Sequence, residues 1–391
     1  MKNHIIIGMI ITIILSCEEV KTIQKETMID FGKDEYAVSS TATFDGGMVI
    51  GGTTTSIRDN QEMLFMKFDK DNRRLWAKTI GGHTIDKCYD VMELKDRSIV
   101  AIGSVEYSAF NTDMLVVKMN ERGEVLWSRT FGGRNTDEGR ALAQAEDGAI
   151  MALGTTLSFG AGGGDMFLVK IGQDGSLIWQ RTIGQVYADA GRDIQALANG
   201  GYIIAGNRSD GQTPYQASLT QITSDGEEVW SRVYAAGSVS EARSVIVLPD
   251  GGFIFAGRAR VSTVVGSTST FAVKTNAIGD VSWAQNYYTS KNNESSCIVA
   301  INDNAALIGG FIDTRVRMTQ AFSVIVKIED GSEMDMNTYN DSTYSLGYSI
   351  VRRDNVFDLI GGAIPKGTAV GADKLNVVIN RVKLPTDVLS K

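Results

Sequence analysis

The sequence predicts an all-β fold, a seven-bladed β-propeller, from three features that recur along the 391-residue chain. A run rich in aliphatic residues that ends in Gly occurs seven times, and the spacing between copies is 51 to 53 residues. Those runs end at Gly52, Gly103, Gly154, Gly206, Gly257, Gly310 and Gly362. The second series is "LFMK", "LVVK", "FLVK", "SLTQ", "FAVK" and "VIVK", with "NVV" as a degenerate seventh. The third series contains all five tryptophans, which are Trp76, Trp127, Trp179, Trp230 and Trp283. Repeats of this length are typical of propellers, solenoids or arrays.

Each unit predicts four short strands, and the second unit shows them most clearly. They are "CYDVMEL", "SIVAIGS", "DMLVVKMN" and "EVLWSRTF", all rich in the aliphatic, β-branched and aromatic residues that favour strands. Tight turns such as "PDGG" and "GQDGS" separate the first strand from the second and the third from the fourth. Their Gly and Asp residues tolerate the backbone angles of tight hairpins. Four strands per repeat of about 50 residues indicate the blade of a propeller.

The two ends of the chain predict how the ring closes. After Gly362 the last unit supplies only its third strand, "KLNVVINRV", and no fourth. The stretch "TIQKETMIDF", residues 22–31, precedes the first complete unit and belongs to none. We expect it to complete blade seven, because closure removes sheet edges that would otherwise invite aggregation. Eight blades with one degenerate copy remain the alternative.

The first residues predict a targeting signal that is not part of the fold. Lys2 is followed by an apolar run from Ile5 to Leu15, shorter than the roughly 20 residues that span a bilayer. This pattern predicts a secretory signal peptide over residues 1–16. The stretch "ILSC" resembles the bacterial lipobox, a resemblance that implies acylation of Cys17 after cleavage before it. A plain secreted protein or an uncleaved anchor remains open.

The predicted organisation follows from these segments. We expect a signal peptide at 1–16, a lipid-anchored linker at 17–21, the propeller at 22–382 and a C-terminal tail at 383–391. Glu18 and Glu19 resemble the surface-export signals of lipoproteins in the Bacteroides–Flavobacterium group. This implies a lipid-anchored protein of the outer membrane, displayed at the cell surface, with the periplasmic face as the alternative. If residues 22–31 form the outermost strand, the lipid holds the face with short turns close to the membrane.

Composition narrows the classes of partner. The formal net charge is −8, from 38 basic and 46 acidic residues, and no strong basic run occurs. Nucleic acid is therefore not an expected partner, since such binding needs clustered Lys and Arg. Cys88 and Cys297 fall in non-adjacent units, so we expect buried free thiols rather than a disulfide.

Several motifs resemble a known group of proteins. "WSRTFGGRNTDEGR", "DGGFIFAG" and "GGGDMFLVKIGQDGSLIW" are similar to the β-propeller repeats of bacterial surface and secreted proteins, in the broad quinoprotein-like group. The resemblance covers nearly all of residues 22–382 and implies the fold, but members serve many roles. The sequence departs from the pattern in unit six, where Met336 takes the Trp position, and in unit four, where Gln221 takes the Lys position.

Two ladders of residues are candidates for function or for structure. The tryptophans all fall in the predicted outermost strand, so we expect a structural wedge between blades rather than a platform for sugars or a quinone. Acidic residues stand at the start of the innermost strands. They are Asp86, Asp137, Asp189, Glu241 and Glu294. We expect them to tie each blade to the next loop by charge-assisted bonds. Cation binding or general acid–base chemistry is the alternative.

The long links between strands predict the binding face. The links from second to third strand, such as "SVEYSAFNTD" and "TTLSFGAGGGD", share one face with the blade-to-blade links and vary in sequence. Variable loops on a rigid scaffold commonly carry binding. The candidate ligand-binding residues are Tyr107, Phe110, Phe159, Tyr187 and Tyr215 on this face, with Arg140, Arg192 and Arg243 near the channel rim. Alternatively, the aromatic side chains only pack the loops.

The function predicted is binding rather than catalysis. After signal removal the only His is His83, so a Ser-His-Asp triad and a His-rich metal site are not expected, and no cofactor is predicted. We expect a non-catalytic binding or scaffold lipoprotein whose long-loop face points away from the membrane, towards an envelope protein or a glycan. A carboxylate-dependent glycan hydrolase or lyase with its site at the channel mouth is the alternative.

Overall fold

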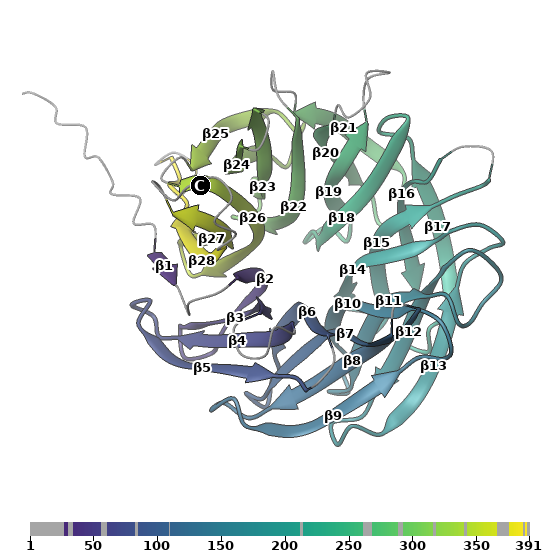
Figure 1. Ribbon diagram of the computed structural model, residues 1–391. Helices are drawn as coiled ribbons and strands as arrows, with labels where there is room; N and C mark the ends of the chain where they lie inside the picture. The colour runs from purple at the N-terminus through teal and green to yellow at the C-terminus, as the bar shows by residue number, and fades with distance from the viewer. Residues whose placement is uncertain are drawn as a thin grey trace, which may run out of the picture.

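The computed structural model confirms the seven-bladed β-propeller (Figure 1). It describes residues 27–29, 34–55, 61–82, 85–108, 110–211, 214–260, 268–287, 292–315, 318–339, 342–365, 375–385 and 388. All elements in this part of the chain are strands, in seven antiparallel sheets of four. Over the same residues, no helix has the length and apolarity needed to cross a bilayer. Cys17 and the predicted segments 1–16 and 17–21 lie outside the described residues.

Blades 1 to 6 follow one another along the chain, each with its strands in sequence order from the channel outward. Blade 1 comprises β2 (Glu35–Ala42), β3 (Met48–Thr54), β4 (Glu62–Phe68) and β5 (Arg74–Ile80). Blade 2 comprises β6 (Ile85–Glu93), β7 (Ile99–Ser108), β8 (Asn111–Met119) and β9 (Val125–Phe131). Blade 3 comprises β10 (Asp137–Gln144), β11 (Ile150–Thr156), β12 (Asp165–Ile171) and β13 (Leu177–Ile183).

The second half repeats this plan and joins the two ends. Blade 4 comprises β14 (Ala190–Ala196), β15 (Tyr202–Arg208), β16 (Gln216–Ile222) and β17 (Glu228–Tyr234). Blade 5 comprises β18 (Val239–Val247), β19 (Phe253–Arg260), β20 (Thr268–Thr275) and β21 (Val281–Tyr287). Blade 6 comprises β22 (Asn293–Ala300), β23 (Ala305–Arg315), β24 (Met318–Lys327) and β25 (Glu333–Tyr339). Blade 7 orders β1 (Thr27–Ile29), β28 (Asn376–Arg381), β27 (Val356–Pro365) and β26 (Ser342–Arg353). Figure 1 shows purple β1 beside yellow β28, to which it is paired.

The core lies between blades rather than inside any one of them. The two middle strands of a blade are buried on both faces, as β3, β4 and β12 show, so their sequences are continuous apolar runs. The outermost strands, such as β9 and β13, are largely exposed. Each apolar cluster joins adjacent blades; one unites Val100 and Val116 of blade 2 with Ala152 and Phe167 of blade 3.

Every innermost strand carries a β-bulge at the same place, and this bulge explains the Gly series. In β10 the register shifts between Gly139 and Ala141, and Gly154 of β11 pairs with Gly139. A Cβ on Gly154 would lie 2.0 Å from the carbonyl oxygen of Glu138, so no larger residue fits beside the bulge. In blade 7 the equivalent residue is Gly361, which pairs with Gly347. The prediction of Gly362 as the seventh member is therefore wrong by one residue.

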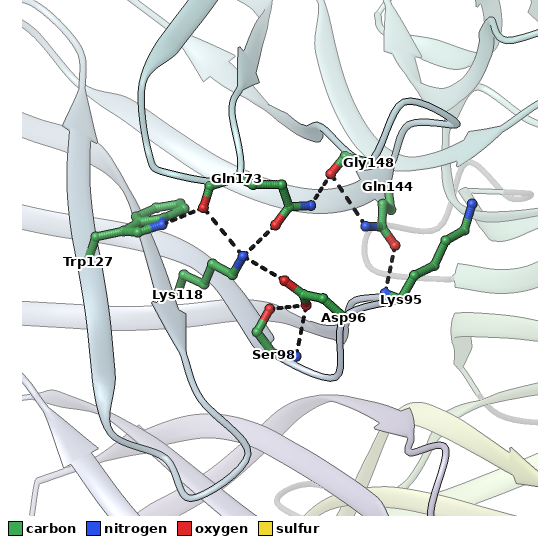
Figure 2. A network of polar contacts seen from close by, with 8 residues as sticks. All are labelled: Lys95, Asp96, Ser98, Lys118, Trp127, Gln144, Gly148 and Gln173. Atoms are coloured by element: carbon green, nitrogen blue, oxygen red, sulfur yellow. Dashed lines mark hydrogen bonds and ion pairs between the residues drawn. The ribbon is translucent and has the colours of Figure 1, made fainter.

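The tryptophans pack on the next blade, as Figure 2 shows for Trp127. Its indole Nε1 donates to the carbonyl oxygen of Gln173 at 3.0 Å, and its ring covers Gly175 in the turn before β13. Trp76 donates equivalently to Glu121 and Trp283 to Ile328. All five tryptophans are half-buried and lie against the glycine of the next blade's outer turn.

A buried lysine accompanies this wedge. Lys118 is 5% exposed and its Nζ lies 3.0 Å from Asp96, while it also donates to the carbonyl oxygen of Gln173 at 3.3 Å (Figure 2). Lys67 with Asp45 and Lys170 with Asp147 repeat the pair at 2.9 Å. In blade 4, Gln221 replaces the lysine and Asn199 replaces the aspartate. Both members are neutral, so this blade avoids the cost of burying an unpaired charge.

Blade 6 departs from the predicted register. Gly310 pairs with Phe322, so Ile325 stands in the Lys position and pairs with Asp335, which stands in the Trp position. The assignment of Met336 to the Trp position is therefore wrong, although Met336 does pack beside Trp283 in the same apolar cluster. The turn between β24 and β25 is one residue longer than in blade 3, since Val326 pairs with Glu333 whereas Ile171 pairs with Leu177. Lys327 lies beyond that last pair, at the end of β24, so aligning it with the other lysines displaced the register.

A second set of bonds ties the innermost strands together. Asp90 accepts the Ser39 hydroxyl at 2.6 Å from blade 1 and the Leu142 amide at 2.9 Å from blade 3. Asp193 accepts the Ser244 hydroxyl and the Val245 amide of blade 5. Burial raises the pKa of Asp90 to about 6, although these hydrogen bonds oppose the rise. These carboxylates are part of the scaffold.

The C-terminal segment packs on the propeller. Val388 is buried with Leu384 beside Phe357 of blade 7, and the Asn302 side-chain amide donates to the Val388 carbonyl oxygen at 2.7 Å. The segment therefore lies at the face with the short turns, because Asn302 belongs to the turn between β22 and β23.

Candidate functional site

Three arginines meet at the long-loop end of the central channel. Arg140, Arg192 and Arg243 occupy the bulge of β10, β14 and β18, in adjacent blades. The innermost strands begin at the long-loop face, and the bulge lies near that end. A bulge re-aims the side chain that it carries. The three side chains are between 22% and 30% exposed, so they line the channel mouth and do not extend into the solvent beyond it.

Carboxylates are interleaved with these guanidinium groups. Glu241 lies 2.5 Å from Arg192 and 3.3 Å from Arg243, and Arg258 of β19 reaches it at 3.0 Å. Glu294 of β22 lies 3.1 Å from Arg243 and 3.4 Å from Arg258. Arg140 pairs with Glu138. We name Arg140, Arg192, Arg243 and Arg258 the arginine cluster. It holds four guanidinium groups against three carboxylates.

The predicted acid ladder is wrong at its fourth and fifth members, Glu241 and Glu294. The position three residues before the bulge is occupied by Glu35, Asp86, Asp137, Asp189, Ser240, Asn293 and Ser345. Glu241 and Glu294 stand one residue later and face the channel. Asp137 accepts the Gly133 amide of the preceding link at 2.7 Å and the Ser158 hydroxyl of the β11–β12 link at 2.6 Å. It therefore holds its own blade to the link before it, whereas the expected bond was to the next loop.

The charges of the cluster act on one another. Burial opposes ionisation of Glu241, but the guanidinium groups of Arg192, Arg243 and Arg258 outweigh it and lower the pKa of Glu241. Burial also lowers the pKa of Arg192; Glu241 opposes this, and Arg140 and Arg243 add to it. Glu241 is therefore an ionised partner for arginine at neutral pH, and the arginines are close enough to repel each other.

One guanidinium N–H of the cluster lacks an acceptor. The Arg140 Nε is buried and makes no hydrogen bond, while its guanidinium carbon lies 4.2 Å from the centroid of the Tyr89 ring. An unsatisfied buried donor costs about 1–3 kcal/mol. An acceptor from the channel would remove that cost if the guanidinium group turned towards the mouth.

Exposed apolar side chains follow the same face over blades 2 to 4. We name this set the aromatic ridge; it comprises Tyr107, Phe110, Leu157, Phe159, Val186, Tyr187 and Tyr215. Phe110 is 84% exposed and Val186 69% exposed. Large apolar residues gathered at one face of a soluble domain mark a contact surface.

The structure refines where the five predicted aromatic residues lie. Tyr107 belongs to β7, whose hairpin with β8 continues to Ser108 and Asn111, so that link is mostly strand and not loop. Phe159 contacts Phe167 with ring centroids 5.6 Å apart. Tyr187 lies in the link between blades 3 and 4, where its ring covers Gly211. Phe159 and Tyr187 therefore pack loops with part of their surface, and Phe110 projects freely.

A small hollow connects the ridge to the cluster. Tyr215, Glu241, Arg258 and Thr268 line it, between blades 4 and 5. Tyr215 belongs to the aromatic ridge and Arg258 to the arginine cluster. Arg258 was missed by the sequence prediction because it lies in a second strand, where no other unit has an arginine at that position.

The other candidate chemistries have no support in the described residues. No group of three or more His, Cys, Asp and Glu side chains there is placed to hold a metal ion. Cys88 and Cys297 are free thiols, as expected, and burial raises the pKa of both. His83 lies outside the described residues.

Comparison with known proteins identifies the fold. No protein-family model matches the chain. An alignment over 204 positions, which covers 45% of this chain and 21% of the relative, shows 25% identity to the regulatory protein FlaEY of Caulobacter vibrioides. Because the match covers only about a fifth of FlaEY, the activity of that protein is not assigned to this chain.

Solved propellers superpose over most of the chain. The WD40 β-propeller domain of Doa1 has a TM-score of 0.55 at 14% identity, covering 93% of this chain and 98% of that chain. The polysaccharide lyase Uly1 has a TM-score of 0.56 at 9% identity, covering 88% and 89%. The Hadza microbial sialidase Hz136 has a TM-score of 0.50 at 11% identity, covering 83% and 74%. At these identities the likeness is one of fold, shared by binding and glycan-processing proteins.

Proposed function

We propose that this protein is a non-catalytic binding propeller of the bacterial cell envelope, held at the outer membrane through a lipid on Cys17. Its long-loop face points away from the membrane and binds a partner protein or a glycan. The aromatic ridge carries the proposal. Aromatic residues and arginine are the side chains most enriched where binding energy concentrates, and here they adjoin.

The orientation rests on chain direction. An outermost strand runs from the short-turn face to the long-loop face, so Thr27 of β1 stands at the short-turn end. Cys17 precedes Thr27 by ten residues, a reach of at most about 35 Å. A lipid on Cys17 therefore lies nearer to the short-turn face than to the long-loop face. The acidic pair Glu18 and Glu19 favours the cell surface over the periplasmic leaflet.

The test uses the lipidated protein in its own envelope. After detergent solubilisation, the chain is captured and its partners are compared between wild type and a Tyr107→Ala/Phe110→Ala variant. A matched control is Phe44→Ala, which removes a side chain that is 63% exposed in a turn of the opposite face. We expect the retained protein or glycan to be lost from the ridge variant alone. Equal retention by all three proteins contradicts the proposal.

The anchor is tested separately. We expect Cys17→Ser to take up no labelled palmitate and to leave the membrane fraction. Label retained by the variant contradicts the anchor without bearing on the ridge.

A glycan hydrolase or lyase with its site at the channel mouth is the second candidate, and the charge environment of Glu241 disfavours that residue as its acid. A general acid at neutral pH needs a carboxyl group with a raised pKa. Glu241 has a lowered pKa because it faces three arginines. If the protein cleaves an envelope glycan and Glu241→Gln abolishes that cleavage, the enzyme becomes the favoured candidate.

A further inference from the structure

We propose that the arginine cluster binds the carboxylates of an acidic peptide segment presented by the partner protein. This rests on the proposed function, and it assigns the chemical class that the channel mouth selects. The four guanidinium groups stand at the rim of a channel, next to the aromatic ridge, and the three carboxylates beside them leave an excess of positive charge.

The cluster departs from the symmetry of the fold. The seven bulge residues are Val38, Tyr89, Arg140, Arg192, Arg243, Ser296 and Tyr348. Arginine occupies this position in three consecutive blades and in no other. The Gly series, which the bulge requires, recurs in all seven blades. The bulge does not require the arginines, so they are available for a role specific to this side of the channel.

Their donors are only partly used. The Arg140 Nε has no acceptor. Glu241 receives contacts from three guanidinium groups at 2.5 to 3.3 Å, more than one carboxylate binds in the bidentate fork that arginine favours. A further carboxylate that enters from the mouth, in addition to Glu241 and Glu294, would accept the remaining N–H groups and relieve the repulsion between neighbouring arginines.

The composition of the ridge favours a peptide over an acidic glycan. Phe110, Leu157 and Val186 are apolar throughout and offer a sugar no hydrogen bond. The Tyr187 ring is covered on one side by Gly211, and the Tyr89 face carries Arg140. The ridge therefore suits apolar side chains of a protein, and the hollow lined by Tyr215 and Arg258 leads from there to the cluster.

The test measures binding of defined probes to the full chain. The first is a short fluorescein-labelled peptide of alternating Glu and Tyr; the second replaces each Glu by Gln. Proteins compared are wild type, Arg140→Gln/Arg243→Gln, and Lys95→Gln/Arg122→Gln. The last pair removes the same charge from exposed turns of the opposite face. Melting curves establish that each variant is folded, and Arg192→Lys provides a second variant that keeps the charge but loses the planar fork.

We expect the Glu peptide to bind wild type and the opposite-face variant equally, and the cluster variant at least about tenfold more weakly. The Gln peptide should not bind, and Arg192→Lys should fall between. Equal affinity of the cluster and opposite-face variants overturns the inference. Tighter binding of oligogalacturonate than of the Glu peptide overturns the peptide assignment in favour of an acidic glycan.

The failure of this inference is distinguishable from failure of the proposed function. If the envelope partner is lost from the ridge variant but kept by Arg140→Gln/Arg243→Gln, the binding propeller stands and the role of the arginine cluster falls. If the ridge variant keeps every partner, the proposed function falls first.

Discussion

Two blade junctions hold the start of an innermost strand with different side chains, one pair charged and the other neutral. Between blades 2 and 3, Asp113 and Asp137 flank Gly132; a Cβ there would lie 2.2 Å from the Asp113 Oδ1 and 2.8 Å from the Asp137 Oδ2. Between blades 4 and 5, Gln216 and Ser240 take the two acidic positions, and Ala235 takes the glycine position. The Ser240 hydroxyl donates to Gln216 at 2.8 Å and accepts the Ala217 amide at 3.0 Å.

The comparison shows what this part of the junction requires. At both junctions the first residues of an innermost strand supply an acceptor for a nearby backbone amide, that of Gly133 in one case and that of Ala217 of β16 in the other. A polar acceptor is therefore needed but a charge is not. The charged version places two carboxylates close together, and it needs glycine to make room. At the junction of blades 3 and 4, where Asp165 and Asp189 stand, Arg208 lies 3.4 Å from Asp189 and offsets the repulsion.

The largest predicted loss of stability comes from the outermost strands, where both junctions have a tryptophan packed on the next blade. We expect Trp127→Ala and Trp230→Ala each to destabilise the fold by about 3 kcal/mol, because each ring covers a glycine turn of the next blade. Chemical denaturation measures both. Widely unequal losses would mean that the junctions differ along their whole length and not only at the inner end.

The next effect separates the two polar positions. Asp137→Ala leaves the Gly133 amide and the Ser158 hydroxyl without their acceptor, and we expect a loss of about 2–3 kcal/mol. Ser240→Ala should cost less, about 1–2 kcal/mol, since it removes neutral hydrogen bonds. A larger loss for Ser240→Ala in the same denaturation series would contradict the ranking.

Sequence alone predicted the fold well because the constraints on it repeat. The bulge leaves room only for glycine, and the outer turn of the next blade packs against a tryptophan ring. Both residues therefore recur at a regular spacing that can be seen in the sequence. The missed acid position was also readable: Ser240 and Asn293 stand ten residues after their tryptophans, as Asp86, Asp137 and Asp189 do. Matching by charge instead of by spacing selected Glu241 and Glu294. Arg258 had no such signal, because a site that breaks the repeat has no spacing to reveal it.

A smaller effect tests the space around the acids. Gly132→Ala forces the Asp113 carboxylate to move, and we expect a cost of about 1–2 kcal/mol. The reverse change, Ala235→Gly, removes one methyl at the neutral junction and should cost less than about 1 kcal/mol. Adding Asp113→Ala to Gly132→Ala should recover part of the loss; no recovery would show that the backbone, and not the carboxylate, fills that space.

The smallest effect is a dependence on pH carried by Asp113. Burial raises the pKa of Asp113 above its ordinary 3.8, and the charge of Asp137 adds to the rise. Between the ordinary and the raised value, the folded state binds more protons than the unfolded state, so this group's contribution to stability falls as pH rises through that window. Asp113→Asn removes the contribution. We therefore expect melting temperatures of wild type to decline relative to Asp113→Asn as pH is raised from about 4, until Asp113 is fully ionised. At the neutral junction, Gln216→Ala leaves no titrating group and should run parallel to wild type over the same range. Parallel curves for wild type and Asp113→Asn would mean that the Asp113 carboxylate is solvated or compensated, and the charged junction would then cost no more than the neutral one.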